Sequence, residues 1–97
     1  MGAVRKHDEW LAEKLKDAAF AAEYLTAAAE DDDAATYLAA LRNVAEASGG
    51  MAHIAEQTGL SRETLYRTLS NRGNPTIKTL TAILRASGLK LSFSAKT

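Results

Sequence analysis

The sequence predicts an all-α domain that ends in one short β-strand. Along most of the chain, apolar residues recur at intervals of three and four, which is the period of one face of an α-helix. Aspartate, glycine and proline stand between these stretches, where helices begin and end. Strict alternation of apolar and polar residues is confined to residues 89–94, and alternation is typical of a strand with one covered face.

Three helices are predicted in the first half of the chain. The first forms one or two turns around Trp10, and the second follows Asp17, which we expect to cap it. The third runs from Ala34 to Ser48 and ends at Gly49-Gly50, where left-handed geometry is easily reached. The last aspartates of the acidic run 30–33 can cap this third helix and complement its dipole. The apolar positions of these helices are Trp10, Leu11, Leu15, Phe20, Tyr24, Leu25, Ala28, Tyr37, Leu38, Leu41, Val44 and Ala45.

The second half predicts two short helices within residues 51–69, and then a last helix. Asn74 can cap this last helix, and Pro75 at its first position gives up no internal hydrogen bond. Gly88 ends it. Its expected buried face consists of Ile77, Leu80, Ile83 and Leu84, and the strand that follows carries Leu89, Leu91 and Phe93. To satisfy its backbone, this strand must pair with the N-terminal arm or with its copy in a second subunit.

Length and composition predict one small domain with an appended arm. The chain has 97 residues, of which 46% are hydrophobic and 25% charged. We divide it into an acidic helical arm, residues 1–33, and a domain, residues 34–97. It contains no cysteine, which excludes disulfides and thiolate metal sites and fits a reducing cytoplasm. No stretch approaches the roughly 20 apolar residues of a membrane span, so we expect a cytoplasmic protein without membrane contact.

The formal net charge of zero conceals two oppositely charged halves. Residues 1–50 carry five Lys or Arg against ten Asp or Glu, a net −5. Residues 51–97 carry seven against two, a net +5. Binding to a polyanion is therefore plausible for the C-terminal half alone.

Residues 51–69 have the pattern of a helix-turn-helix. Two helices that cross at a steep angle need a small side chain where they touch and a residue that tolerates positive φ at the turn. Ala55 and Gly59 meet these needs, and the hydroxyl of Ser61 can cap the second helix. The residues expected to point inward are Ile54, Leu60, Leu65 and Leu69.

The outward side chains of the second helix suit double-stranded DNA. Arg62 and Arg67 are candidates for bidentate contacts to guanine, and Glu63 can accept from a cytosine amino group. Tyr66 can reach a phosphate or a thymine methyl. The remaining DNA-binding candidates are Ser61, before this helix, and four residues after it that suit phosphate contacts, Ser70, Asn71, Arg72 and Asn74. The alternative is compact packing with solvated charges, in which Glu63 and Arg67 form a surface ion pair.

The residues at 59–70, 73–80 and 88–91, with those at 23–25 and 37–41, resemble the addiction-module antidote family. These are HigA-like type II antitoxins with a Cro/CI-type helix-turn-helix. The resemblance implies a small five-helix domain like that of lambda repressor, with the N-terminal arm and the C-terminal strand beside it. It also implies that the chain neutralises a RelE/HigB-type ribonuclease toxin and represses the shared operon as a homodimer. The helix that begins at Arg62 would then be the recognition helix.

The implied toxin partnership agrees with the charge of the N-terminal half, which is suited to cover a basic, RNA-binding surface. Trp10, Phe20 and Tyr24 are candidate toxin anchors, because aromatic residues dominate interface hot spots. Use of these residues in the chain's own core is the alternative.

An enzyme is not indicated. His7 and His53 are far apart in sequence, so they support neither a zinc site nor a nucleophile triad. Consecutive aspartates at 31–33 lack the spacing of a calcium loop. We therefore expect no catalytic residues, no metal and no cofactor. The competing function is a stand-alone phage-type repressor that shares the DNA-binding half and never meets a toxin.

Overall fold

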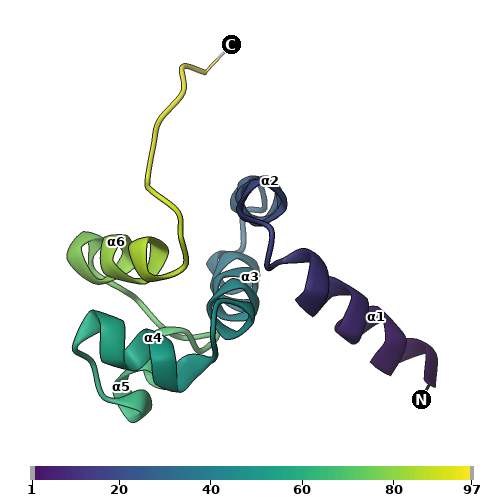
Figure 1. The fold of residues 1–97 in the computed structure, drawn as a ribbon. Coiled ribbons are helices and arrows are strands. Elements are labelled where there is room, and N and C mark those ends of the chain that lie inside the picture. Colours follow the sequence, from purple (N-terminus) through teal and green to yellow (C-terminus); the bar gives the residue numbers. More distant parts are fainter. Residues whose placement is uncertain (1, 97) are drawn as a thin grey trace.

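Helices account for all regular structure in residues 2–96. The computed structural model describes the backbone of these residues and the side chains of residues 7–96. The elements are α1 (Gly2–Lys14), α2 (Ala18–Ala29), α3 (Ala34–Ala47), α4 (Met51–Thr58), α5 (Arg62–Thr68) and α6 (Ile77–Ala86). The central helix is α3, which packs against α1, α2, α4 and α6, and α4 also packs against α5 and α6 (Figure 1). The predicted all-α class is confirmed.

The predicted start of the second helix and both predicted ends of the third are confirmed, whereas the first helix is longer than the one or two turns predicted around Trp10. The Asp17 carboxylate accepts a hydrogen bond from the Ala19 N–H at 3.1 Å, and the Asp33 carboxylate accepts one from the Ala35 N–H at 3.0 Å. Gly49 and Gly50 have φ of 107° and 92°, so the chain turns sharply between α3 and α4. After this turn, α4 packs against α3.

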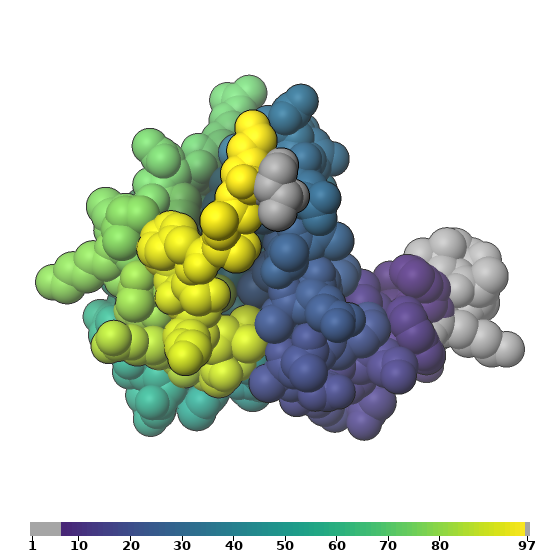
Figure 2. Space-filling view, turned by 90° about the horizontal axis from the view of Figure 1, so that it is seen from above, coloured from purple at the N-terminus to yellow at the C-terminus, as the bar shows by residue number. Residues whose placement is uncertain are grey.

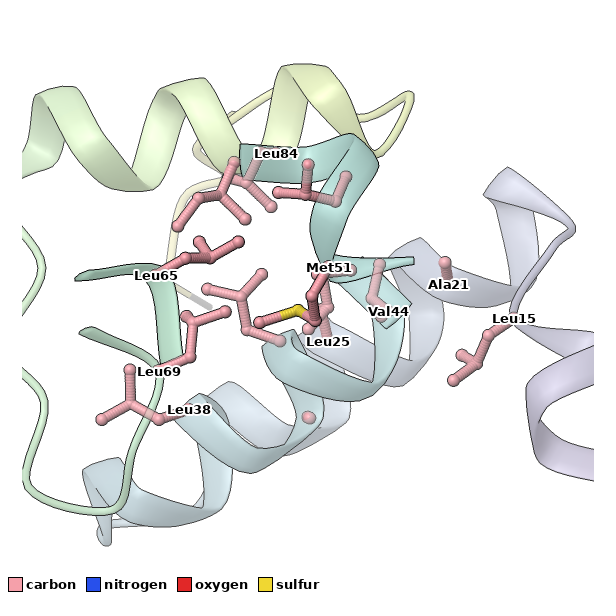
Figure 3. Packing of buried hydrophobic residues seen from close by; sticks show 14 of the residues in the cluster. Leu15, Ala21, Leu25, Leu38, Val44, Met51, Leu65, Leu69 and Leu84 are labelled. Carbon is pink, nitrogen blue, oxygen red and sulfur yellow. The ribbon is translucent and has the colours of Figure 1, made fainter. Parts of the chain in front are cut away.

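One apolar cluster joins the helices. Its buried members are Leu15, Ala21, Leu25, Leu38, Ala40, Leu41, Val44, Ala45, Met51, Ile54, Ala55, Leu65, Leu69, Ile83 and Leu84. Figure 3 shows Leu65, Leu69 and Leu84 pointing toward Met51 in the space between the helices. Among residues 7–96, no polar or charged side chain is buried. The core is held together by apolar packing alone.

The first helix, α1, stands apart from the other five. It projects away from them in Figure 1, and Figure 2 shows its coloured part touching the body on one side only. Leu15, directly after α1, is 2% exposed and ties this end of the helix to the core. Most side chains of residues 7–14 remain exposed.

The predicted C-terminal strand is wrong. Residues 89–96 have no regular secondary structure, and Phe93 is 90% exposed. The segment leaves α6 and extends away from the helices in Figure 1. A strand needs a neighbour to accept and donate its backbone hydrogen bonds, and the described part of this chain offers no sheet edge. The alternation of apolar and polar residues was therefore not sufficient to predict a strand in this segment.

The predicted start of the last helix is also wrong. Thr76, rather than Asn74, caps α6: its hydroxyl accepts a hydrogen bond from the Thr79 N–H at 3.1 Å. Pro75 consequently precedes the cap instead of occupying the first helical position. Ile77 takes that position and is 70% exposed, so it does not belong to the buried face, whereas Ile83 and Leu84 are buried as expected. Gly88, with φ of 79°, follows the helix as predicted.

Candidate nucleic-acid interface

A three-residue turn joins α4 to α5. Gly59 has φ of 77°, in the left-handed region, and its N–H donates to the Ala55 carbonyl at 3.0 Å. The Ser61 hydroxyl accepts a hydrogen bond from the Thr64 N–H at 3.0 Å and so caps α5. The Thr58 hydroxyl donates to the Ile54 carbonyl at 2.8 Å and closes the end of α4. The turn chemistry predicted from the sequence is confirmed.

The inner face of this helical pair is fixed by complete burial. Ile54, Leu65 and Leu69 are each 0% exposed, and Ala55 is 5% exposed. Leu60, in the turn, is half-buried against the same cluster. Because Leu65 and Leu69 lie four residues apart, they hold one side of α5 against the core and leave the opposite side free.

The free side of α5 presents the predicted DNA-contacting residues together. Arg62, Glu63, Tyr66 and Arg67 are all exposed, and Tyr66 is 42% exposed despite its size. Within residues 7–96, no ion pair joins Glu63 to Arg67, so the alternative of a surface ion pair is not borne out. Two guanidinium groups and one phenol therefore face solvent on a single helix surface.

The loop after α5 extends this surface. Asn71, Arg72 and Asn74 are exposed there. The Ser70 hydroxyl donates to the Arg67 carbonyl at 2.8 Å and thus closes the end of α5. The hydroxyl of Ser61 is engaged in the same way at the other end, donating to Thr64 Oγ1 at 2.8 Å. These two serines of the predicted set hold the helix ends, while the other residues point outward.

Gly73 in this loop is a residue whose role sequence reasoning missed. A Cβ atom on Gly73 would lie 1.8 Å from the Thr68 carbonyl oxygen, a distance shorter than any allowed van der Waals contact. The Gly73 N–H donates to the Ser70 carbonyl at 2.9 Å. Only a residue without a side chain lets the loop pass this close to the end of α5. Positive φ does not distinguish Gly73, because its φ lies outside the left-handed region.

We predict that Gly73→Ala displaces the loop and weakens DNA binding. Forcing a methyl group into a packed contact costs about 1–3 kcal/mol, and here the neighbour is backbone that cannot rotate away. Thermal unfolding and duplex binding measure the two effects. Gly88→Ala is the control, because it introduces strain from positive φ with no atom within 4 Å of the new Cβ. A Gly73→Ala protein that binds DNA like the wild type would contradict the prediction.

The candidate toxin anchors divide into two groups. The Trp10 ring meets the Phe20 ring edge-on at 6.0 Å, and the Lys14 ammonium lies 6.0 and 5.8 Å from their respective centres. Tyr24 lies elsewhere and accepts a hydrogen bond from the Asn43 amide at 3.0 Å. Trp10 is 52% exposed, whereas Phe20 and Tyr24 are half-buried against the core. Trp10 is thus the most accessible of the three.

A cleft of about 510 Å³ separates α1 from α3. Its apolar floor includes Leu11 and Leu15, and the carboxylates of Asp8 and Glu46 line it from the two helices. The cleft combines apolar contact area with negative charge, which are complementary to a basic protein surface.

Comparison with known proteins decides the family. A family model described as "Probable addiction module antidote protein" matches residues 4–95. The chain belongs to this family. A relative within the curated proteins, an uncharacterized protein of Haemophilus influenzae strain Rd, is 39% identical over 67 residues, which cover 69% of this chain and 68% of the relative. No solved structure matches the chain.

Membership of the antidote family implies a cognate toxin as a partner. None of the helices in the described residues has the length and apolar character needed to cross a membrane. Within the same residues, no cluster of three or more His, Cys, Asp or Glu side chains is arranged to hold a metal ion.

Proposed function

We propose that this chain is the antitoxin of a type II toxin–antitoxin module. It binds and neutralises a RelE/HigB-type ribonuclease toxin, and as a homodimer it represses its own operon. The chain itself performs no catalysis. The observation that carries the proposal is the free face of α5, where Arg62, Tyr66 and Arg67 are exposed together. The opposite side of this helix is buried in the apolar core of the chain.

The geometry of α5 supports DNA binding. A helix that enters the major groove contacts base edges with side chains near its N-terminal end. Arg62 is the first residue of α5, and Tyr66 and Arg67 follow one turn later. The loop with Asn71 and Arg72 lies at the other end of the helix, where phosphate contacts would fix its orientation.

The charge of the N-terminal half supports toxin binding. A toxin that cleaves RNA needs a basic surface to hold a polyanion, and residues 1–50 carry a net −5. The cleft between α1 and α3 places Asp8 and Glu46 beside apolar contact area. A stand-alone repressor would use the same α5 face, but it gives no reason for an exposed Trp10 on a projecting helix.

Co-expression with the adjacent small gene tests the proposal. A tag on this chain alone is used for purification, and the partner is also expressed by itself. Co-purification of a basic protein in fixed ratio, together with toxicity of that protein alone, supports the antitoxin. A harmless partner that does not co-purify contradicts the antidote function and leaves the repressor.

We predict that Trp10→Ala weakens toxin binding without unfolding the chain. Truncating an aromatic hot spot costs about 2 kcal/mol or more, roughly a 30-fold loss of affinity. Calorimetric titration with the purified partner measures this loss. Phe93→Ala is the matched control, since Phe93 is an aromatic residue 90% exposed in the oppositely charged half. Equal affinity of the two variants would contradict a role for Trp10.

A further inference from the structure

A second cleft lies beside the C-terminal end of α5. It has a volume of about 330 Å³ and is lined by Ala35, Ala39, Arg42, Leu69, Ser70 and Asn71. Arg42 comes from α3, whereas Leu69 to Asn71 directly follow α5. Leu69 is fully buried and lies near Leu38 of α3 in Figure 3, which fixes this loop against α3. The small side chains of Ala35 and Ala39 leave the space open.

Hydrogen-bond donors contribute to the lining of this cleft. Arg42 is half-buried, and its guanidinium has no carboxylate partner among residues 7–96. Asn71 also lines the cleft, and its backbone N–H donates to no acceptor in the same part of the chain. A planar guanidinium beside a free amide donor matches the oxygens of a phosphate group.

We infer that this cleft receives a phosphate of the DNA backbone, with Arg42 as a positioning residue. The inference rests on the proposed DNA binding by α5. When a helix lies in the major groove, the sugar-phosphate backbones pass on either side of it, and contacts to them fix its register. Arg42 supplies such a contact from α3, a helix that belongs by sequence to the acidic half. It is the one basic residue between Asp17 and Gly50.

The nearby acidic turn does not neutralise this site. Asp33 caps the N-terminus of α3, nine residues before Arg42. At a rise of 1.5 Å per residue, the two are about 13 Å apart along the helix axis. Charges separated by more than the Debye length of about 8–10 Å are largely screened at physiological salt. The acidic turn therefore weakens the attraction between Arg42 and a phosphate in contact with it only slightly.

The test is the salt dependence of binding to a mixed-sequence DNA duplex. One phosphate contact contributes about −0.9 to the slope of log K against log salt concentration. We expect Arg42→Gln to reduce the magnitude of the slope by about 0.9 and to weaken binding about eightfold at about 0.1 M salt. The loss should be the same on a duplex from upstream of the gene, since phosphates carry no sequence information. Arg42→Lys should keep most of the slope.

Arg85→Gln is the matched control. It also removes one arginine charge, but from the last turn of α6, which packs on α4 and α3 and does not line the cleft. Its slope should stay within experimental error of that of the wild type. Thermal unfolding of each variant separates lost contact from lost fold, and Arg42→Ala, which also removes the charge and suits a helix, retains the test if Arg42→Gln unfolds.

The outcomes separate the inference from the function on which it rests. If the wild type shows no salt-dependent binding to duplex DNA, the proposed DNA binding fails and this inference fails with it. If the wild type binds and Arg42→Gln keeps its full slope, the inference alone is overturned. It is also overturned if inorganic phosphate at matched ionic strength stabilises the wild type but not Arg42→Gln while the DNA slopes stay equal, because the cleft would then hold a free anion.

Discussion

Leu65→Ala is expected to remove a large part of the stability of the fold. Leu65 is 0% exposed on the inner side of α5. Replacing a buried leucine by alanine costs about 2–5 kcal/mol, a large part of the roughly 5–15 kcal/mol that holds a domain together. For a domain of this size, Tm should fall by about 10–30 °C. Calorimetry or circular dichroism during heating measures the shift.

Ile77→Ala is the control for this substitution. It also deletes branched aliphatic carbon atoms, but Ile77 is 70% exposed, so the expected change is within about 0.5 kcal/mol. If both variants lost equal stability, the burial assigned to Leu65 would be wrong. Because Leu65 anchors the inner side of the helix whose outer side carries the arginines, its loss should also abolish DNA binding near the new Tm.

Arg67→Ala is expected to reduce sequence discrimination strongly while leaving the fold intact. Arg67 is exposed on α5, without an ion-pair partner among the described side chains. A bidentate contact from arginine to guanine discriminates by about 1–3 kcal/mol, which is roughly 5- to 150-fold in affinity. Binding to the duplex from upstream of the gene should fall by this factor, and binding to a mixed-sequence duplex should change little.

Arg72→Ala provides the contrast. Removal of a residue that contacts phosphate should weaken binding to both duplexes by the same factor. Fluorescence anisotropy at one fixed salt concentration gives both ratios. If Arg67→Ala keeps the wild-type ratio of specific to non-specific affinity, Arg67 does not recognise a base. Arg62 is then the next residue to test.

Local chemistry made much of the helical framework predictable. Asp17, Asp33 and Ser61 cap helices through their own side chains, and Gly59 adopts the positive φ that its turn requires. Each of these features depends on a few neighbouring residues, which the sequence displays directly. The exposed face of α5 was predictable for the same reason, because the leucines at 65 and 69 determine which side is buried.

Features that depend on distant partners were not predictable. Thr76 and Asn74 are both good caps, and only the course of the loop selects Thr76. The alternation in residues 89–94 describes one strand but cannot supply the second. The role of Gly73 depends on its contact with Thr68, and the role that we propose for Arg42 depends on the cleft beside Asn71. Neither contact can be inferred from spacing along the chain.

The buried core contains no group that carries a charge. No charged side chain of residues 7–96 is fully buried, so each described charge stays at least partly in water on folding. Burial raises the pKa of the half-buried Tyr37 phenol above its ordinary value of 10.0, so folding favours its neutral form. That contribution is fully present below pH 10 and is lost as the pH rises through the raised pKa. Desolvation of this one phenol therefore makes the free energy of unfolding fall in the alkaline range, above pH 10.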